Sequence, residues 1–363
     1  MAERPAAGIL PAHKIAELIA AKAIRVARKP DRDQIQPASL DLRLGSRAYR
    51  VRASFLPGPE MTVAERLAML TLHEIDLSTS AVLEPGCVYI VPLMESLALP
   101  ADLAAAANPK SSTGRLDIFT RVITDRAREF DTVPAGYNGP LYLEVSPRTF
   151  PIVARAGSRL SQIRFRRGSS RLDDKALLAL HRRSVLVDGP PHVAGGLVLS
   201  IDLAGANDII GYRAKRHTGL IDVDKRGAHD VLDFWEPIAP RGRAELVLDP
   251  DQFYILVSRE AVHVPPDYAA EMVPFDPLVG EFRVHYAGFF DPGFGHSESG
   301  GAGSRAVLEV RSHEIPFILE DGQTVGRLVY ERMIERPQML YGQGIGSHYQ
   351  AQGLKLSKHF RAG

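Results

Sequence analysis

Apolar and polar residues alternate over short segments along most of the chain, and turn-forming residues separate these segments. Alternation with a period of two is typical of strands, whereas one face of a helix repeats every 3.6 residues. Many short strands with turns between them predict an all-β sandwich or barrel, with a few short helices, and not a parallel α/β sheet. The predicted strands of the first half are Ser39 to Leu44, Val88 to Leu93, Ile118 to Thr124, Leu141 to Val145, Ile152 to Ala154 and Leu160 to Phe165.

Two segments have helical spacing instead. Residues Pro11 to Val26 place apolar side chains three or four positions apart, which predicts a short amphipathic helix. A second helical patch is expected at Asp174 to Leu180.

The two halves of the chain repeat each other. Residues Glu95 to Asp102 (ESLALPAD) recur as Glu260 to Asp267 (EAVHVPPD), 165 positions later, and the same offset takes Leu143-Glu144-Val145 to Leu308-Glu309-Val310. Two further matches have other offsets. Ser39 to Leu42 matches Ser200 to Leu203 at an offset of 161 residues, and Phe130-Asp131 matches Phe290-Asp291 at an offset of 160 residues. This self-similarity predicts two tandem copies of one β domain.

We expect four segments: a first copy at 1–167, a linker at 168–194, a second copy at 195–335, and a C-terminal lid or tail at 336–363. The polar segment Pro109 to Arg115 (PKSSTGR) has no counterpart in the second copy, although Glu309 matches Glu144. We therefore predict one functional site per chain, in the first copy, and a structural role for Glu309.

The segment Pro109 to Arg115 is dense in hydroxyls and cations and lies between two mainly apolar runs, so we expect it to form a loop held by a rigid scaffold. Strand alternation directs Glu144 to the opposite face from Leu143 and Val145. A carboxylate in such a strand needs a partner, and a guanidinium can hold it in an oriented pair. The pattern predicts Arg115 as that partner.

Hydroxyls and backbone N–H groups in a turn that contains glycine bind phosphate oxygens, and Lys110 adds a point charge. An anion site is therefore expected here. Asp131 before a turn and Tyr137 after it suit a sugar hydroxyl and a ring, although each residue judged alone is more typical of a turn former and a core aromatic.

Composition excludes several classes. The 44 lysine and arginine residues against 43 aspartate and glutamate residues give a net charge of +1, which does not favour nucleic acid or an anionic membrane as a partner. No run approaches the ~18 apolar residues of a membrane helix. Cys87 is the one cysteine, so a disulfide within the chain and a cysteine-based zinc site are excluded, as expected of a cytoplasmic protein. A zinc deaminase needs further zinc ligands of that kind.

The motifs of the first copy resemble the dCTP deaminase branch of the dUTPase-like superfamily in order and spacing. They are Pro37 to Gly45 (PASLDLRLG), Pro109 to Arg115, Asp131 with Gly136 to Gly139, Leu143 to Val145 and Ala156 to Gln162 (AGSRLSQ). The tail Tyr349 to Lys358 (YQAQGLKLSK) resembles the C-terminal lid of that branch.

This resemblance implies a β-clip (distorted jelly-roll) fold, a homotrimer with sites between subunits, Mg²⁺ on the triphosphate without zinc, and hydrolytic deamination of dCTP to dUTP and ammonia. Glu144 would be the general base and acid, with Ser111 and Arg115 beside it. The substrate-binding residues implied are Lys110, Ser112, Asp125, Arg126, Asp131, Tyr137, Gln162, Tyr349, Gln352, Lys355 and Lys358. Whether the tail closes the site of its own chain or of a neighbour stays open.

Two other functions remain. A dUTPase, or a bifunctional enzyme that produces dUMP, would need a water activated at the α-phosphate, for which Asp131 is the candidate. A catalytically silent nucleotide-binding module is the third hypothesis.

Overall fold

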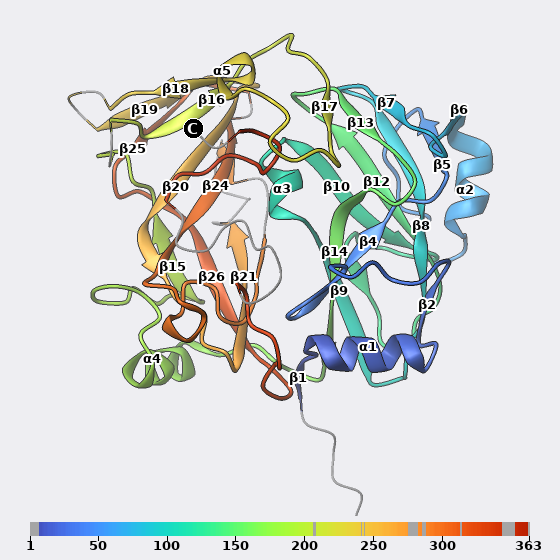
Figure 1. The fold of residues 1–363 in the computed structure, drawn as a ribbon, viewed down its shortest axis with the longest axis horizontal. Helices are drawn as coiled ribbons and strands as arrows, with labels where there is room; N and C mark the ends of the chain where they lie inside the picture. Colours follow the sequence, from blue (N-terminus) through green and yellow to red (C-terminus); the bar gives the residue numbers. More distant parts are fainter. Residues whose placement is uncertain are drawn as a thin grey trace, which may run out of the picture.

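The computed structural model describes residues 7–205, 208–240, 242, 244–274, 282–284, 288–312, 314–342 and 353–361. Strands make up most of the ordered elements, and the helices are short, which confirms the all-β prediction (Figure 1). The helices are α1 (Ala12–Ala20), α2 (Val63–Leu70), α3 (Ser111–Gly114), α4 (Asp174–Arg183), α5 (Val231–Phe234) and the 3₁₀ turn η1 (Ser297–Ser299).

The first copy forms two large sheets. One has the order β11-β9-β14-β4-β3, with β1 beside β14, and the other has the order β10-β12-β8-β5-β6, with β2 beside β8. Their strands are β1 (Gly8–Ile9), β2 (Ile24–Val26), β3 (Ile35–Gln36), β4 (Ser39–Arg43), β5 (Arg47–Val51), β6 (Thr71–Asp76), β8 (Val88–Ala98), β9 (Leu103–Pro109), β10 (Ile118–Thr124), β11 (Thr132–Val133), β12 (Asn138–Pro147) and β14 (Arg159–Arg167).

The second copy repeats this plan with the orders β15-β26-β21-β23 and β18-β16-β20-β24-β22, and a pair β19-β25. A three-stranded sheet, β17-β13-β7, joins the copies, because β17 from the second copy runs parallel to β13 from the first. The strands are β7 (Ala81–Leu83), β13 (Ile152–Ala154), β15 (Leu197–Ser200), β16 (Gly211–Ala214), β17 (Ile221–Asp222), β18 (Trp235–Ile238), β19 (Glu245–Leu248), β20 (Phe253–Val262), β21 (Tyr268–Pro274), β22 (Phe282–Val284), β23 (Phe289–Phe290), β24 (Ser304–Ser312), β25 (Phe317–Glu320) and β26 (Thr324–Arg332).

Strand pairing confirms the internal repeat. Leu143 pairs with Val91, and Leu308 pairs with Leu256, which are the residues 165 positions later. The pairing of β14 with β9 has the same relation to the pairing of β26 with β21. The copies therefore share strand register as well as sequence.

The two matches with other offsets are wrong. Leu40 pairs with Ile163 in the first copy. Leu328, the equivalent of Ile163, pairs with Leu197 in the second copy, so the structural equivalent of Leu40 is Leu197 and not Ile201. The expected register differs from the observed one by four residues, an even shift that keeps every side chain on the same face, so alternation could not distinguish them.

The second wrong match lies on β23. Val133 pairs with Ala105 in the first copy. Phe290 pairs with Ala270, the equivalent of Ala105, in the second copy, so the structural equivalent of Phe290 is Val133 and not Phe130. A short Phe-Asp match carried no information about pairing.

The predicted N-terminal helix is correct only in its first part. Helix α1 ends at Ala20, and Ile24–Val26 forms β2, in which Ile24 pairs with Leu97 of β8. The helical patch in the linker is confirmed as α4, which begins after the capping residue Asp173.

An aromatic cluster packs the two copies together. Phe150 of the first copy meets Trp235 of the second with ring centroids 5.4 Å apart, and Phe360 of the tail lies 5.9 Å from Trp235. These side chains belong to the hydrophobic core of the first copy, which continues across the interface. Burial of such large rings fixes the copies in one relative position. None of the helices in the described ranges is long and apolar enough to cross a membrane.

Candidate active site between the two copies

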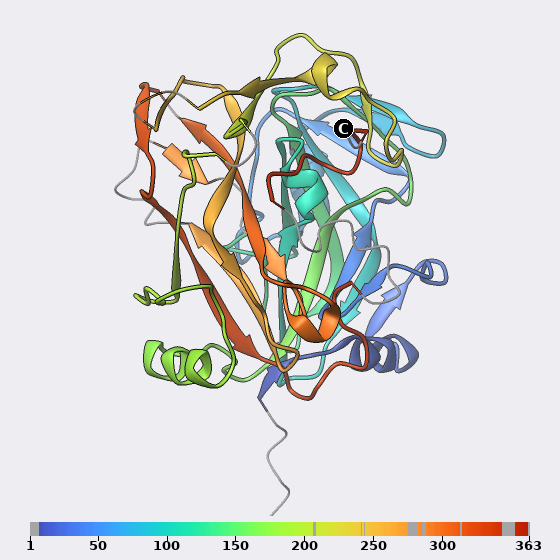
Figure 2. The ribbon, with the colours of Figure 1, turned by 60° about the vertical axis from the view of Figure 1, so that its left-hand side comes forward.

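Helix α3 lies at the interface, between the sheets of the first copy and strand β24 of the second (Figures 1 and 2). It is a single turn between the largely buried strands β9 and β10, closed by bonds from the N–H groups of Gly114 and Arg115 to the carbonyls of Lys110 and Ser111, at 3.0 and 3.1 Å. The predicted polar loop is thus a short helical turn on a rigid scaffold.

Arg115 reaches from this turn to Glu309 on β24. Its Nε lies 3.9 Å from Oε1 of Glu309, and its Nη1 donates a 2.9 Å bond to the carbonyl of Lys355 in the tail. Arg115 is 3% exposed and Glu309 5%. Burial raises the pKa of the Glu309 carboxyl to about 7, and the charge of Arg115 opposes that rise. The acid is therefore poised near neutrality.

The expected pairing of Arg115 with Glu144 is wrong. Glu144 accepts bonds of 3.1 and 2.7 Å from Nε and Nη2 of Arg121, which stands directly opposite it on β10. The Arg121 guanidinium also covers the ring of Phe130, with its carbon 3.5 Å from the centroid. The partner of Glu144 is thus its cross-strand neighbour Arg121, and not the arginine of the polar segment.

Four other predicted residues belong to the structure of the first copy. The Asp125 carboxylate accepts the N–H of Val63 at the start of α2 at 2.8 Å, and Arg126 is exposed. Tyr137 donates to the carbonyl of Pro140 at 2.7 Å. Asp131 accepts the N–H of Val122 at 2.7 Å, and burial raises its pKa to about 7. These bonds join the side chains to neighbours in the first copy, and Asp131 also lies close enough to Glu271 of the second copy for the charge of Glu271 to raise the pKa of Asp131.

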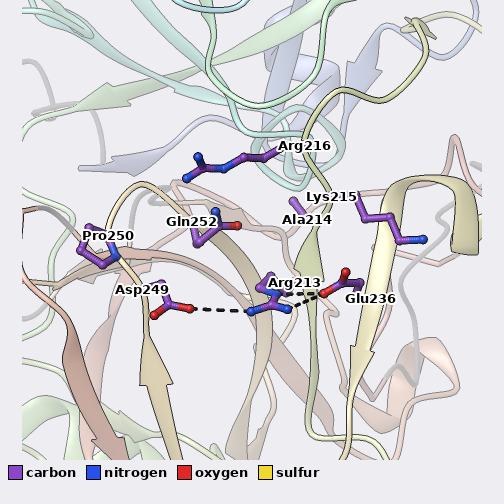
Figure 3. A pocket seen from close by; sticks show the side chains of 8 residues that line it. All are labelled: Arg213, Ala214, Lys215, Arg216, Glu236, Asp249, Pro250 and Gln252. Carbon is purple, nitrogen blue, oxygen red and sulfur yellow. Dashed lines mark hydrogen bonds and ion pairs between the residues drawn. The ribbon is translucent and has the colours of Figure 1, made fainter.

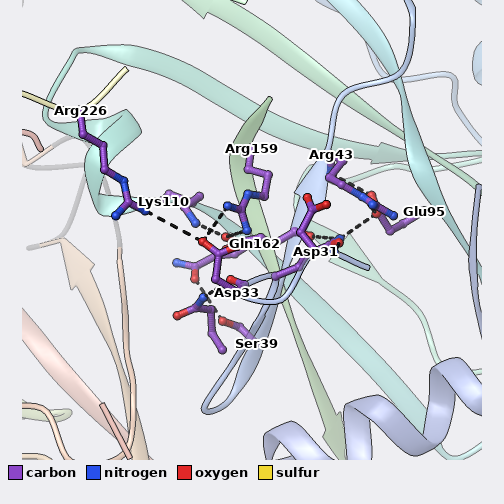
Figure 4. Close-up of polar contacts among 12 residues, drawn as sticks. Asp31, Asp33, Ser39, Arg43, Glu95, Lys110, Arg159, Gln162 and Arg226 are labelled. Atoms are coloured by element: carbon purple, nitrogen blue, oxygen red, sulfur yellow. Dashed lines mark hydrogen bonds and ion pairs between the residues drawn. The ribbon is translucent and has the colours of Figure 1, made fainter. Parts of the chain in front are cut away.

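A cluster of cations lies beside α3 (Figure 4). We call Lys110, Arg159, Arg226 and Lys358 the cation cluster. Two carboxylates lie among them: Asp41 pairs with Lys110, and Asp33 lies 2.9 Å from Nη2 of Arg159 and 4.0 Å from Nη2 of Arg226. Burial, together with repulsion from Lys110 and Arg226, lowers the pKa of Lys358 to about 8. The charge of Asp31 also acts on Arg159, so four cations face three acids here within the described residues, which still leaves positive charge for an anion.

The tail closes over α3. Ser357 donates to the carbonyl of Ser112 at 2.8 Å and contacts Nδ1 of His359 at the same distance. The tail thus docks on its own chain, and it brings Lys355 and Lys358 to the site. The predicted residues Tyr349 and Gln352 lie outside the described residues.

The remaining predicted residues are close to the turn. A side chain at Gly288 of the second copy would lie 4.0 Å from Oγ of Ser111. Gln162 accepts from Ser39 at 3.1 Å and donates to the carbonyl of Pro109 at 3.4 Å. The structure therefore brings together Lys110, Ser111, Ser112, Arg115, Gln162, Lys355 and Lys358.

A hollow of about 720 Å³ in the second copy is a separate feature (Figure 3). Arg213 in the lining of this hollow lies 2.6 Å from Glu236 and 3.7 Å from Asp249. The charge of Arg213 is therefore neutralised by these two carboxylates. None of the predicted site residues lines it.

Sequence reasoning missed the place of Glu309 and the role of Arg226. The match of Glu309 to Glu144 was a usable signal, but the sequence assigned Arg115 to Glu144 and gave no partner for Glu309. Arg226 follows β17 in an ordinary polar stretch, and no local pattern distinguishes it.

A buried acid of raised pKa beside a guanidinium, in a region that also carries a cluster of cations, is typical of an enzyme site for proton transfer on an anionic substrate. Residues 6–169 match the family model of the 2′-deoxycytidine 5′-triphosphate deaminase N-terminal domain, and residues 173–360 match the model of its C-terminal domain. The chain belongs to the dCTP deaminase family, and the resemblance seen in the sequence is confirmed.

Relatives extend this result. A crystal structure of 2′-deoxycytidine 5′-triphosphate deaminase from Agrobacterium tumefaciens is 68% identical, with a TM-score of 0.89 over 92% of this chain and 100% of that one, which supports the dUTPase-like fold. A dCTP deaminase of Halorubrum lacusprofundi is 32% identical over 36% of this chain and 63% of the relative. A "dCTP deaminase, dUMP-forming" of Beutenbergia cavernae is 32% identical over 40% and 73%. The chain thus matches less than two thirds of the length of the Halorubrum protein.

Proposed function

We propose that this chain deaminates dCTP hydrolytically to dUTP and ammonia at the site between its two copies. Glu309 is the general base and acid, and Ser111 and Arg115 act beside it. The observation that carries this assignment is the contact of buried Glu309 with Arg115, in a member of the dCTP deaminase family. Glu309 takes the role that the sequence suggested for Glu144.

The chemistry needs one carboxylate that moves protons in sequence. Water adds through its oxygen to C4 of cytosine while the Glu309 carboxylate takes one of its protons and passes it to N3. A second proton then goes from the added hydroxyl to the amino nitrogen, the C4–N bond breaks, and ammonia leaves a carbonyl at C4. Ser111 holds the water.

Two opposing effects set the proton affinity of Glu309. Burial favours the neutral acid, and Arg115 favours the carboxylate. At about 4 Å two opposite charges attract by about 4 kcal/mol in a medium of effective dielectric constant 20. The balance leaves the carboxyl able both to accept and to return a proton near neutral pH.

The cation cluster suits the triphosphate. A nucleoside triphosphate carries about four negative charges, and its desolvation is costly without cations. We propose that Mg²⁺ arrives on the triphosphate as part of the substrate, because the nearby Asp33 and Asp41 already contact Arg159 and Lys110. Zinc has no role in this proposal.

The metal proposal predicts two results. Omission of Mg²⁺ should raise KM for dCTP, because the phosphate charge is then compensated by the protein alone. A chelator selective for Zn²⁺ should leave turnover unchanged while Mg²⁺ is in excess. Initial rates of ammonia release measure both, and inhibition by that chelator would contradict the proposal.

The products of dCTP turnover test the function. The chain is incubated with dCTP and Mg²⁺, and ammonia, dUTP, dUMP and pyrophosphate are followed. Ammonia with dUTP supports the proposal. Ammonia with dUMP and pyrophosphate would show the bifunctional activity named for the Beutenbergia relative. Binding without turnover would show a nucleotide-binding module instead.

Lys358 gives a prediction for the basic limb of the pH profile. Its pKa of about 8 means that the ammonium is lost as pH rises through 8, so KM for dCTP should rise there. With the carboxylate of Glu309 forming through about 7, kcat/KM should peak between these two values. Lys358→Met should raise KM at pH 7 and flatten the basic limb, whereas Lys175→Met on exposed α4 should do neither. A basic limb that persists in Lys358→Met would refute this assignment.

Assembly and location are further proposals. We retain the homotrimer that the family resemblance implies. The face of the first copy that carries Glu144 corresponds to the face of the second copy that packs on α3, which makes it a candidate face for contact between chains. Light scattering in solution measures the assembly. The single free cysteine, Cys87, suits a reducing compartment such as the cytoplasm.

A further inference from the structure

A second buried ion pair crosses the interface beside the proposed acid. Arg311 of β24 pairs through Nη2 with Oδ2 of Asp117 in the first copy. The side chains are 9% and 1% exposed. Thr149 donates to the same Asp117 oxygen at 2.6 Å and accepts from Nη2 of Arg311 at 3.0 Å. The contact is a closed hydrogen-bonded group of three residues, which we call the clamp.

The clamp lies two residues from each member of the proposed catalytic pair. Asp117 follows Arg115 by two positions at the end of the α3 turn, and Arg311 follows Glu309 by two positions on β24. Residues two apart on a strand point to the same face, so Arg311 and Glu309 both face the first copy. The contact of Arg115 with Glu309 and the contact of Asp117 with Arg311 are therefore adjacent, and both join β24 to the α3 turn.

Each member of the clamp is fixed within its own copy. The N–H of Asp117 donates to the carbonyl of Gly114 at 2.8 Å, and its carbonyl accepts from Arg148 at 2.9 Å. Asp117 has a φ of +55°, a left-handed conformation that non-glycine residues adopt rarely. Arg311 donates through Nη1 to the carbonyl of Asp251 at 2.7 Å. Because each member is held in its own copy, movement of β24 relative to α3 would break the clamp.

The first copy has no equivalent of Arg311 beside Glu144. Ser146 stands at the corresponding position, in the register that aligns Glu144 with Glu309. A buried ion pair is often no more stabilising than packed apolar residues, and its best-supported use is to fix one arrangement. The clamp is thus found beside Glu309, the acid that contacts Arg115, and not beside Glu144.

We propose that Asp117 and Arg311 are positioning residues that set the approach of Glu309 to Arg115. The inference rests on the proposed function. Because a displacement of about 1 Å at a reacting group costs about 10²-fold in rate, the clamp acts on turnover and not on substrate affinity.

The test is Asp117→Asn, with the pH dependence of kcat/KM for dCTP as the main readout. We expect kcat to fall by about 10²-fold with KM changed by less than about threefold. The acidic limb should move to higher pH, because a more distant Arg115 opposes the raised pKa of Glu309 less. Arg311→Lys keeps the charge and should retain more of the rate than Arg311→Met. Should Asp117→Asn fail to fold, Thr149→Val tests the same clamp by removing its hydroxyl.

Glu95→Gln is the matched control. Glu95 is a fully buried partner of Arg43 within the first copy, and the substitution makes the same change from carboxylate to amide. It should lower Tm without moving the acidic limb. An unmoved limb in both Asp117→Asn and Thr149→Val would overturn the inference and leave the clamp as a purely structural contact. Absence of dCTP turnover in the unmodified chain would instead refute the proposed function.

Discussion

Glu309→Gln is expected to reduce kcat for dCTP by about 10²–10⁴-fold, the range that a positioned acid or base contributes. The amide keeps the size of the side chain but cannot accept a proton from water. Binding of dCTP should persist, because the cation cluster that attracts the triphosphate is unchanged. Single-turnover ammonia release gives the rate, and calorimetric titration with dCTP gives the affinity.

Glu144→Gln is the matched comparison. Glu144 holds the same place on β12 as Glu309 on β24, but it contacts Arg121 and not Arg115. Its kcat should stay within about tenfold of the unmodified chain, a change in activation barrier of ~1.4 kcal/mol. The reverse result, with Glu144→Gln inactive and Glu309→Gln active, would disprove the assignment. Loss in both variants would mean that turnover also needs Glu144, through its pair with Arg121 or through contact with another chain.

The fold was largely predictable because strand alternation and the repeat are local signals. The predicted strand at Ile118 to Thr124 and the predicted strand at Ile152 to Ala154 match β10 and β13, and the offset of 165 survives in the pairing. The segment at Ile24 was not predictable in this way, because its apolar spacing continues that of α1 while its backbone pairs with β8. Tertiary pairing overrode the local period.

The site was predictable only in part, because its two sides come from different copies. Hydroxyl and cation density identified the turn that carries Ser111 and Arg115. The acid was assigned to the same copy, although the resemblance implied sites between subunits. In a tandem chain that geometry pairs the turn of one copy with a strand of the other, as Arg115 and Glu309 do. Local sequence patterns cannot predict such a contact, because its two residues lie almost two hundred positions apart.

Arg115→Met is expected to lower kcat/KM for dCTP by about 10²–10³-fold at neutral pH, comparable to loss of one preorganised charge-stabilising donor. The substitution also removes the charge that opposes the raised pKa of Glu309, so that pKa should rise above about 7. Because the carboxylate is the form that accepts the proton from water, the acidic limb of kcat/KM should move to higher pH. The loss should therefore be larger at pH 6 than at pH 9, where the carboxylate forms again.

The full pH profile of Arg115→Met, with circular dichroism to check folding, measures this effect. Arg121→Met is the control, because Arg121 pairs with Glu144, the equivalent acid of the first copy, but lies outside the proposed site. Its acidic limb should coincide with that of the unmodified chain. If the limb of Arg115→Met stays in place or moves to lower pH, Arg115 does not set the proton affinity of the catalytic acid. A shift in Arg121→Met alone would transfer that role to the pair of Arg121 and Glu144.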